Sequence, residues 1–283
     1  MKILLTGASG QVGYELQRSL QGLGEVIAVD RARMDLADLD QVRSVVRAVR
    51  PNLIVNPAAY TAVDKAESEP ALARTINALA PAVLAEEAKA LGAAMVHYST
   101  DYVFDGTREG AYVETDQPNP VSVYGRTKLE GEQAIAAAGI PHLILRTSWV
   151  YGMRGKNFLL TMLRLASERE ELRVVNDQHG APTWSRTIAE ITSLVLARSP
   201  EQGWWERNSG IYHLTSAGTT TWFQFATAIM EQAQRDCRLI PIKSEEYPQP
   251  AARPANSSLN CEKLTRQVIT LPEWRRALAL CMS

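Results

Sequence analysis

The chain lacks several features that would place it in a specialised class of protein. No apolar run approaches the roughly 18 residues that a membrane-spanning helix needs. Its 283 residues include three cysteines, an odd number without a C-x-x-C pair, which fits a reducing compartment and gives no disulfide framework. A formal net charge of −1 gives no general attraction to nucleic acid or to an anionic membrane. We therefore expect a cytoplasmic protein that binds neither.

Metal-binding patterns are scarce as well. The four histidines are scattered, without i,i+4 or cysteine companions, and we interpret His97 and His213 as structural residues of strands. The apolar run at residues 1–7 is too short for a secretory signal and is interpreted as a buried strand. What the chain has is 46% hydrophobic residues and enough length for a sizeable core.

The first half of the chain alternates short apolar runs with amphipathic stretches, the pattern of a parallel sheet with crossover helices. Five such units in the first half predict an α/β fold with a doubly wound, Rossmann-like parallel sheet. The predicted strands are Lys2–Leu5, Glu25–Val29, Leu53–Asn56, Ala94–Ser99 and His142–Thr147. The predicted helices are Gln11–Gln21, Leu39–Val49, Ala71–Leu91 and Tyr124–Ala138.

After residue 152 the pattern changes. A helix over Asn157–Glu168 precedes a short strand near residue 173, and Ile211–Leu214 has the pattern of a strand that returns to the first sheet. We therefore assign residues 1–152 to a dinucleotide-binding domain, with 184–217 as its return segment. Residues 153–183 and 218–283 are expected to form a smaller, discontinuous α/β lobe that binds substrate.

Gly7, Gly10 and Gly13 have G-x-x-G-x-x-G spacing between the first predicted strand and helix. Glycine permits the tight turn, close approach of the backbone to a pyrophosphate, and close packing of the helix on the strand. The helix N-terminus adds free N–H groups and a favourable dipole for phosphates. The pattern therefore predicts a dinucleotide site that also includes Gln11 and Val12.

Asp30 ends the second predicted strand, about 20 residues beyond this turn, where a carboxylate can bind the adenosine ribose. Its alternative role is a helix or turn cap. A carboxylate favours NADH, whereas the neighbouring Arg31 and Arg33 could hold the 2′-phosphate of NADPH, so the sequence leaves both cofactors open. Asp35 and Leu36 are expected to contact adenine, and Asp35 is also expected to cap the next helix.

Tyr124 and Lys128 lie four residues apart near the start of a predicted helix. Positions i and i+4 share a helix face, so the phenol and the ammonium can point into one cleft. We expect the positive charge to lower the pKa of the phenol from about 10, which favours proton donation to a carbonyl under reduction. Such pairs also occur by chance on amphipathic helices, but this one follows a dinucleotide loop and a Ser/Thr strand end.

Together these residues resemble the extended short-chain dehydrogenase/reductase family and, within it, the dTDP-4-dehydrorhamnose reductases. The resemblance covers essentially the whole chain, and the combination is more specific than any single motif. It is carried by residues 7–13, 62–70, 99–104, 124–128, 146–151, 176–183 and 253–257.

The resemblance implies roles for individual residues. Tyr124 would be the acid, Lys128 its electrostatic partner and a ligand of the nicotinamide ribose, and Thr100 the hydroxyl that binds the substrate carbonyl. The alternative role of Thr100 is a strand-end cap, and that of Trp149 is a core position. The further expected substrate contacts are Asp101, Phe104, Trp149, Asn157 and Arg253, and the further expected cofactor contacts are Ala58, Ala59, Tyr60 and Thr61.

The implied reaction is reduction of the C4 ketone of dTDP-4-dehydro-L-rhamnose to dTDP-L-rhamnose with hydride from NADPH or NADH, the last step of dTDP-L-rhamnose synthesis. Tyr102 favours reduction, because related dehydratases carry a glutamate for water elimination at that place. Two alternatives stay open: a reductase of a related nucleotide 4-keto-6-deoxy sugar, and a non-catalytic dinucleotide-binding regulatory subunit.

The resemblance also bears on metal use and assembly. Some members of the family use Mg²⁺ at a subunit contact that involves acidic side chains. Glu15 is the candidate ligand here, although the sequence identifies no partner carboxylates. We expect a nucleotide-sugar substrate and a monomer or homodimer.

Overall fold

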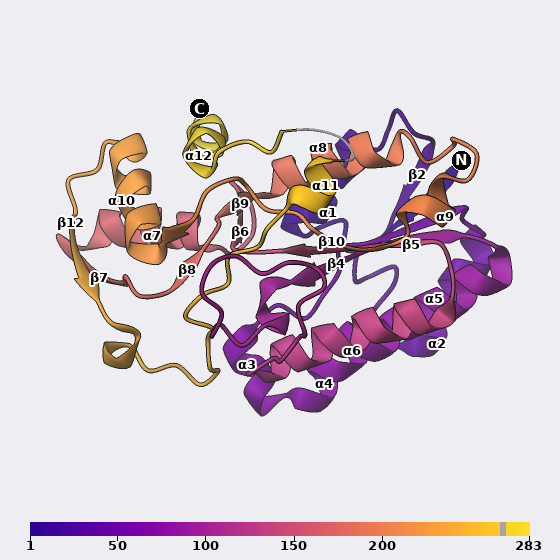
Figure 1. The fold of residues 1–283 in the computed structure, drawn as a ribbon, viewed down its shortest axis with the longest axis horizontal. Helices are drawn as coiled ribbons and strands as arrows, with labels where there is room; N and C mark the ends of the chain where they lie inside the picture. Colours follow the sequence, from indigo (N-terminus) through magenta and orange to yellow (C-terminus); the bar gives the residue numbers. More distant parts are fainter. Residues whose placement is uncertain (267–269) are drawn as a thin grey trace.

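A parallel sheet forms the centre of the larger part of the molecule in the computed structural model, which describes residues 1–266 and 270–283 (Figure 1). Its strands lie in the order β10-β5-β4-β3-β1-β2, and every neighbouring pair is parallel. The order reverses between β1 and β3, and doubly wound sheets bind ligands outside the carboxyl ends at such a point. This sheet confirms the predicted fold class. The strands are β1 (Lys2–Leu5), β2 (Glu25–Ala28), β3 (Leu53–Asn56), β4 (Ala94–Thr100), β5 (His142–Thr147) and β10 (Gly210–His213).

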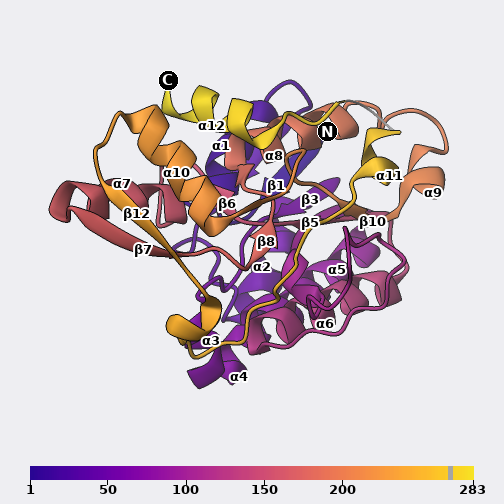
Figure 2. The ribbon, with the colours of Figure 1, turned by 60° about the vertical axis from the view of Figure 1, so that its left-hand side comes forward.

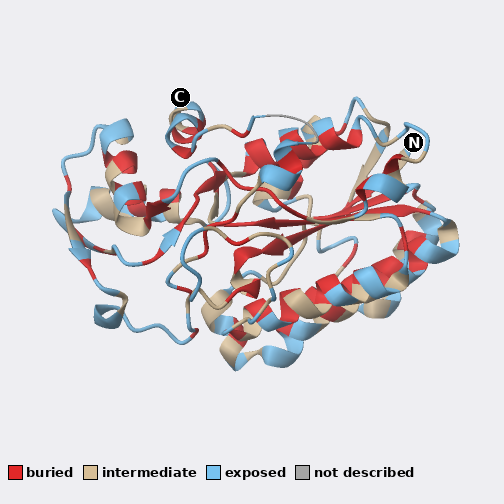
Figure 3. Ribbon diagram, viewed as in Figure 1, coloured by how far each residue is buried: buried red, intermediate tan, exposed pale blue. Residues whose placement is uncertain are grey.

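Helices cover both faces of this sheet because its strands are apolar on both faces. Ile3 and Leu5 of β1 belong to one hydrophobic cluster and Leu4 to another, as the period of two along a strand requires. Figure 3 shows the buried residues along the strands and on the helix faces that meet them. The first face carries α1 (Gln11–Ser19) and α8 (Ser185–Leu196); the second carries α2 (Leu39–Val49), α5 (Ala80–Leu91) and α6 (Val123–Ala138).

The predicted helix Ala71–Leu91 is interrupted. It consists of α4 (Pro70–Arg74), a π-helical turn η1 (Thr75–Leu79) and α5. Within η1, the Asn77 side chain accepts a hydrogen bond from the Tyr60 N–H at 2.8 Å and donates to the Tyr60 carbonyl at 3.1 Å. The π turn therefore fixes the segment that follows β3, consistent with the frequent place of such turns at functional sites.

The smaller part gathers at one end of the molecule, where Figures 1 and 2 both show it. Its β12 pairs in parallel with β7, and α7, α10 and α12 pack into the same hydrophobic cluster. It comes from separate stretches of chain, and β10 returns to the large sheet between them; the domain boundaries themselves stay a prediction. The elements are α7 (Phe158–Glu168), β7 (Glu171–Val175), α10 (Trp222–Ala233), β12 (Arg238–Ile242) and α12 (Trp274–Met282).

Short elements connect these parts. Two further strand pairs are β6 (Val150–Tyr151) with β9 (Thr183–Trp184), and β8 (His179–Gly180) with β11 (Thr220–Thr221). The remaining elements are α3 (Val63–Ser68), η2 (Asp101–Val103), α9 (Trp204–Asn208), η3 (Ser244–Glu246) and α11 (Glu262–Thr265). No helix in the described ranges is long and apolar enough to cross a membrane.

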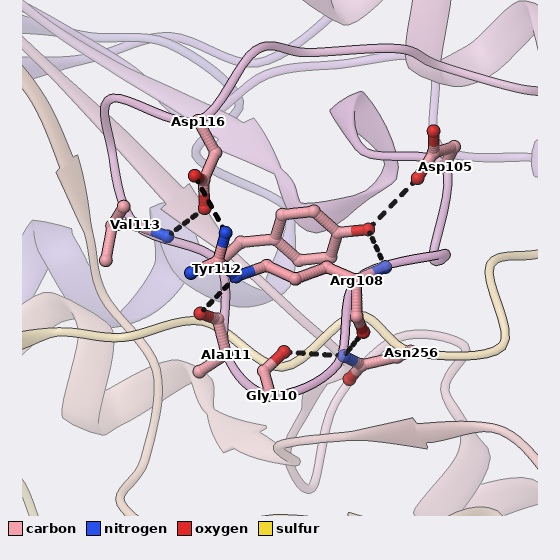
Figure 4. A network of polar contacts seen from close by, with 8 residues as sticks. All are labelled: Asp105, Arg108, Gly110, Ala111, Tyr112, Val113, Asp116 and Asn256. Atoms are coloured by element: carbon pink, nitrogen blue, oxygen red, sulfur yellow. Dashed lines mark hydrogen bonds and ion pairs between the residues drawn. The ribbon is translucent and has the colours of Figure 1, made fainter.

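The loop that follows β4 is fastened to the late segment around residue 256 (Figure 4). The Asn256 side chain donates to the carbonyls of Arg108 and Gly110 at 2.9 and 2.7 Å. The Tyr112 hydroxyl accepts from the Arg108 N–H, and the Arg108 guanidinium pairs with Asp116 at 3.0 Å. These contacts hold the segment near residues 251–258 beside the carboxyl end of β4, although it lies about 150 positions away along the chain.

A buried ion pair joins α6 to β5. Arg146 and Glu132 are only 1% and 2% exposed, and the guanidinium contacts the carboxylate in a bidentate manner at 2.9 and 2.6 Å. Bidentate geometry is the arrangement in which such a pair best offsets the loss of hydration. The pair therefore fixes the position of α6 on the sheet.

We predict that Glu132→Gln lowers the free energy of unfolding by about 3–5 kcal/mol, because Arg146 keeps a buried charge without a counter-charge. Glu130→Gln, on the same helix, is the matched control, since Glu130 pairs with Arg74 at the surface and should cost far less. Urea unfolding of both variants measures the difference. Equal losses would contradict a special role for the buried pair.

Candidate active site

The glycine loop between β1 and α1 has the geometry of a phosphate cradle. Gly7 has φ +57°, and a Cβ there would lie 3.0 Å from the Cα of Ala58. A Cβ on Gly13 would lie 2.1 Å from the Gly7 carbonyl oxygen, so α1 can pack on this loop only without a side chain at that position. Gly10 caps α1 without a side-chain hydrogen bond, and the first-turn N–H groups are those that bind anions at helix N-termini. The loop fits a dinucleotide pyrophosphate.

Gln11 and Val12, the first two residues of α1 after this loop, have different contacts. Gln11 begins α1, and its side-chain oxygen accepts a hydrogen bond from Asn157 at 2.7 Å. Val12 packs against the hydrophobic cluster on the α1 face of the sheet. Asn157 also caps α7 by accepting from the Leu160 N–H at 3.0 Å. The structure therefore gives Asn157 the role of a tie between the cofactor loop and the smaller part, and its contact with substrate stays a prediction.

The end of β2 is organised by Asp30. Its carboxylate accepts from the backbone N–H groups of Ala32 and Arg33 at 3.1 and 3.2 Å, which is the turn-capping role. Ribose binding by the same carboxylate stays a prediction. The Arg31 side chain is 77% exposed and lies 3.2 Å from Asp35, so a guanidinium borders this edge of the sheet.

Asp35 does not cap the next helix, contrary to the expectation. The N-cap of α2 is Asp38, whose carboxylate accepts from the Gln41 N–H at 3.0 Å. Asp35 instead accepts from the Ala37 N–H at 3.0 Å, and this bond, with the Arg31 guanidinium, lowers the pKa of the Asp35 carboxyl. Leu36 is buried in the hydrophobic cluster under α2. Their contacts with adenine stay predictions.

The segment after β3 lies beside the glycine loop. The Ala58 N–H donates to the Thr6 hydroxyl at 3.3 Å, and Asn77 holds the backbone of Tyr60. The Tyr60 hydroxyl donates to Glu69 at 2.6 Å, which raises the pKa of the phenol to about 12. Ala58 thus borders the cradle, and the contacts of Ala58, Ala59, Tyr60 and Thr61 with the cofactor stay predictions.

Thr100, Tyr124 and Lys128 come together at the carboxyl end of β4. The helix α6 starts at Val123 because the Ser122 hydroxyl accepts from the Gly125 N–H at 3.1 Å. A Cβ on Gly125 would lie 2.1 Å from the carbonyl oxygen of Tyr102, so this glycine lets the first turn of α6 approach η2. The sequence reasoning missed Gly125. As a result the phenol of Tyr124 lies close enough to the Thr100 hydroxyl for that hydroxyl to influence its pKa.

The expectation that Lys128 lowers the pKa of Tyr124 is wrong for this arrangement. Burial raises the pKa of the phenol to about 12, and the neighbouring Thr100 hydroxyl only partly opposes that shift. The Lys128 ammonium is directed elsewhere, toward the Tyr98 carbonyl at 2.6 Å and His97 Nε2 at 3.1 Å. Burial lowers the pKa of Lys128 to about 8, and the negative charge of Glu132 opposes that shift.

Asp101 and Tyr102 border this cluster. Asp101 accepts a hydrogen bond from the Thr100 hydroxyl at 3.0 Å. Burial raises the pKa of its carboxyl to about 6, against the lowering effect of the nearby Ser257 and Thr100 hydroxyls. The Tyr102 ring meets the Tyr124 ring edge-on, with centroids 5.8 Å apart. Tyr102 therefore lies between the cluster of Thr100 and Tyr124 and the space beyond it.

That space is a cavity of about 740 Å³ in the smaller part of the molecule, within the usual size of a ligand pocket. Arg253 borders it, but its guanidinium is held by Asp64 of α3 through two bonds of 2.9 and 2.7 Å. The lining residues are Tyr102, Phe158, Thr161, Met162, Leu165, Arg169, Glu171, Leu172, Arg173, Val174, Val175, Gln178, Trp222, Ile242, Glu246, Tyr247, Gln249 and Arg253.

Two aromatic residues expected to contact substrate have different surroundings. Trp149 stacks on Trp222, a residue of the cavity wall, with ring centroids 3.6 Å apart. Its φ of +46° is unusual for a residue other than glycine. Phe104 is fully buried and stacks on Tyr112 at 4.1 Å. A fully buried ring has no surface left for a ligand, so Phe104 serves packing rather than substrate contact.

Glu15, the residue expected to bind Mg²⁺, belongs to no cluster of metal-binding side chains in the described part of the chain. Glu15 contributes to the electrostatic surroundings of Arg186 and Cys281. Residues 1–266 and 270–283 contain no group of three or more histidine, cysteine, aspartate or glutamate side chains that could hold a metal. The described residues of one chain therefore do not provide the ligands of a Mg²⁺ site around Glu15.

The fold and this geometry coincide with a known family. A family model described as the RmlD substrate binding domain matches residues 1–283. The chain belongs to this family. Members resemble it over their full length: the dTDP-4-dehydrorhamnose reductase of Burkholderia thailandensis is 50% identical, with 100% of this chain and 98% of the relative covered. The resemblance inferred from the sequence motifs is thereby confirmed.

Solved structures of dTDP-4-dehydrorhamnose reductases have the same fold as this chain. The dTDP-4-dehydrorhamnose reductase of Clostridium acetobutylicum is 41% identical, with a TM-score of 0.91 and coverage of 100% of this chain and 98% of that one. The dTDP-4-dehydrorhamnose reductase of Bacillus anthracis, solved in complex with NADP, is 36% identical, with a TM-score of 0.92 and coverage of 99% and 98%.

We predict that Gly13→Ala weakens dinucleotide binding and lowers stability by about 1–3 kcal/mol, because its methyl group would collide with the Gly7 carbonyl. Gly22→Ala is the control, since a Cβ at exposed Gly22 meets nothing within 4 Å. Thermal unfolding and a fluorescence titration with NADPH measure both effects. Wild-type affinity in Gly13→Ala would argue against the cradle.

Proposed function

We propose that the chain reduces the C4 ketone of dTDP-4-dehydro-L-rhamnose to dTDP-L-rhamnose, the last step of dTDP-L-rhamnose synthesis, with hydride from NADPH or NADH. The observation that carries the proposal is the proximity of the Thr100 hydroxyl and the Tyr124 phenol at the carboxyl end of β4. Two hydroxyls that meet there, next to a dinucleotide cradle, are suited to bind one carbonyl oxygen. The names of full-length relatives and the NADP complex of the Bacillus anthracis protein support the same reaction.

Tyr124 is proposed as the proton donor. Its raised pKa keeps the phenol protonated throughout the neutral range, which is the state that an acid needs before the reaction. When bound, the reduced nicotinamide supplies the hydride. As negative charge develops on the carbonyl oxygen, the Thr100 and Tyr124 hydroxyls stabilise it, and Tyr124 transfers its proton to that oxygen.

Lys128 is proposed to stabilise the phenolate that Tyr124 becomes. The lysine lies one helical turn after the tyrosine and is 99% buried, so its charge acts through a medium of low polarity. Its ammonium keeps two protein acceptors, Tyr98 O and His97 Nε2, and has a third N–H to offer. The family resemblance assigns that N–H to the nicotinamide ribose.

The nucleotide part of the substrate is proposed to occupy the cavity between Tyr102 and α7. The cavity combines aromatic and aliphatic walls with a few charged groups, including Arg169, Arg173 and Arg253, that could meet a diphosphate. Tyr102 places the catalytic hydroxyls next to one end of it. A sugar attached to the nucleotide could therefore extend to Thr100 and Tyr124.

The direct test is to mix the protein with NADPH or NADH and dTDP-4-dehydro-L-rhamnose and to follow the loss of reduced-nicotinamide absorbance. We expect turnover. Absence of turnover with both cofactors would favour the non-catalytic alternative. A panel of nucleotide 4-keto-6-deoxy sugars, ranked by kcat/KM, distinguishes this substrate from its relatives.

We predict that Tyr124→Phe lowers kcat by about 10²–10⁴-fold and leaves the Kd of NADPH nearly unchanged, because only the proton donor is lost. Tyr212→Phe is the matched control: its buried hydroxyl donates to the Asn208 carbonyl, and we expect near-normal kcat. Steady-state kinetics and cofactor titration separate the two effects. Parallel loss of turnover and cofactor binding in Tyr124→Phe would make this tyrosine structural.

Cofactor choice is proposed to depend on Arg31, the exposed guanidinium at the end of β2. We predict that Arg31→Ala raises the KM for NADPH about tenfold, the cost of losing a hydrogen bond to a charged group, and changes the KM for NADH little. Arg235→Ala, exposed just after α10, should change neither value. Equal effects on the two cofactors would show that Arg31 does not recognise the 2′-phosphate.

A further inference from the structure

Lys128 is the last residue in a row of buried side-chain hydrogen bonds that starts next to the glycine loop. The Thr6 hydroxyl lies 2.6 Å from Asn56 Oδ1, and Asn56 Nδ2 lies 3.1 Å from His97 Nδ1. His97 Nε2 in turn lies 3.1 Å from Lys128 Nζ. All four side chains are at most 1% exposed. These hydrogen bonds connect the residue after β1, the end of β3 and the middle of β4 to the helix that carries Tyr124.

The donors and acceptors in this row of hydrogen bonds determine the tautomer of His97 and the orientation of the Asn56 amide. A lysine ammonium only donates, so His97 Nε2 must accept and the proton of the neutral ring must be on Nδ1. Nδ1–H needs an acceptor, and Asn56 can supply one only by turning its amide oxygen toward His97. The oxygen and nitrogen of an amide occupy equivalent places, and their assignment follows from the partners. Asn56 then donates its NH₂ group to Thr6.

The charges around Lys128 explain why a neutral partner is needed. Glu132 of α6 is the nearby carboxylate, but both its oxygens are bound by Arg146 of β5. Asp101 of η2 contacts Thr100, and Tyr124 shares α6 with the lysine. Burial and the charge of Lys128 hold the pKa of His97 well below its usual value, so the imidazole stays an acceptor.

We propose that His97, fixed in its Nδ1–H form by Asn56, is a positioning residue that holds the Lys128 ammonium and directs its remaining N–H toward the cofactor side of the cleft. The inference rests on the proposed function of Tyr124 and Lys128. It assigns to His97 more than the structural role that its place in a strand predicts. Loss of the acceptor at Nε2 should destabilise the ammonium and leave it free to turn away.

Two amide substitutions at one position separate positioning from packing. In His97→Gln the amide can reach the place of Nε2 and accept from Lys128, whereas in His97→Asn the shorter amide reaches only the place of Nδ1. We expect kcat near the wild-type value for His97→Gln and about tenfold lower at pH 8 for His97→Asn. Thr192→Val is the control, because Thr192 bonds Tyr98 on the other face of β4 and does not contact Lys128.

The pH profile supplies a measurement that packing alone would not change. Activity needs the charged lysine, so it falls as pH rises through the pKa of Lys128. Without its acceptor the ammonium is less stable and that pKa decreases, so the alkaline limb of kcat should move about one unit lower in His97→Asn. It should stay in place in His97→Gln and Thr192→Val. The proposal would be overturned if the two His97 variants had the same kcat and the same position of the alkaline limb. It would also be overturned if the limb shifted equally in Thr192→Val.

The histidine tautomer can be measured without any substitution. In ¹⁵N spectra of the wild-type protein labelled in its histidine rings, we expect His97 to carry its proton on Nδ1 and to have a bare Nε2 at pH 7. A proton on Nε2 would overturn the proposal even if the enzyme is active. If the wild-type protein does not turn over, the proposed function fails while the tautomer still tests the arrangement of His97.

Discussion

The close approach of α6 to the carboxyl end of β4 is the constraint on which the candidate site depends. It is possible because Gly125 has no side chain to collide with the Tyr102 carbonyl, and Ser122 starts the helix at the right residue. The buried pair of Glu132 and Arg146 then fixes the helix on the sheet. Only with α6 in this place does the phenol of Tyr124 meet the Thr100 hydroxyl.

A second requirement is the positioning of the cofactor beside these hydroxyls. The glycine loop, the segment after β3 and the end of β4 lie along one edge of the sheet because their strands are parallel neighbours. The π turn at η1 holds Tyr60 in that edge through Asn77. Binding groups from distant parts of the sequence therefore meet without long loops, and the cavity in the smaller part opens next to them because Tyr102, directly after β4, contributes to its wall.

Features set by local geometry could be predicted from the sequence: the parallel sheet, the glycine spacing, and Tyr124 with Lys128 on one helix face. Contacts between distant residues could not. His97 lies 31 residues from Lys128, Asn56 lies 41 from His97, and Arg253 lies 189 from Asp64, so each pair depends on strand order and packing. The pKa of Tyr124 was mispredicted for the same reason, because spacing shows a nearby cation but not burial.

The separation of charges around Lys128 has a physical consequence for the proposed chemistry. If Glu132 paired directly with Lys128, the carboxylate would cancel much of the field that the ammonium exerts on the Tyr124 oxygen. Arg146 instead occupies both carboxylate oxygens, and Lys128 is held by two neutral acceptors, the Tyr98 carbonyl and His97. Neutral acceptors satisfy two N–H groups without removing the positive charge. The lysine can therefore remain buried, fixed in place and still charged when the phenolate forms.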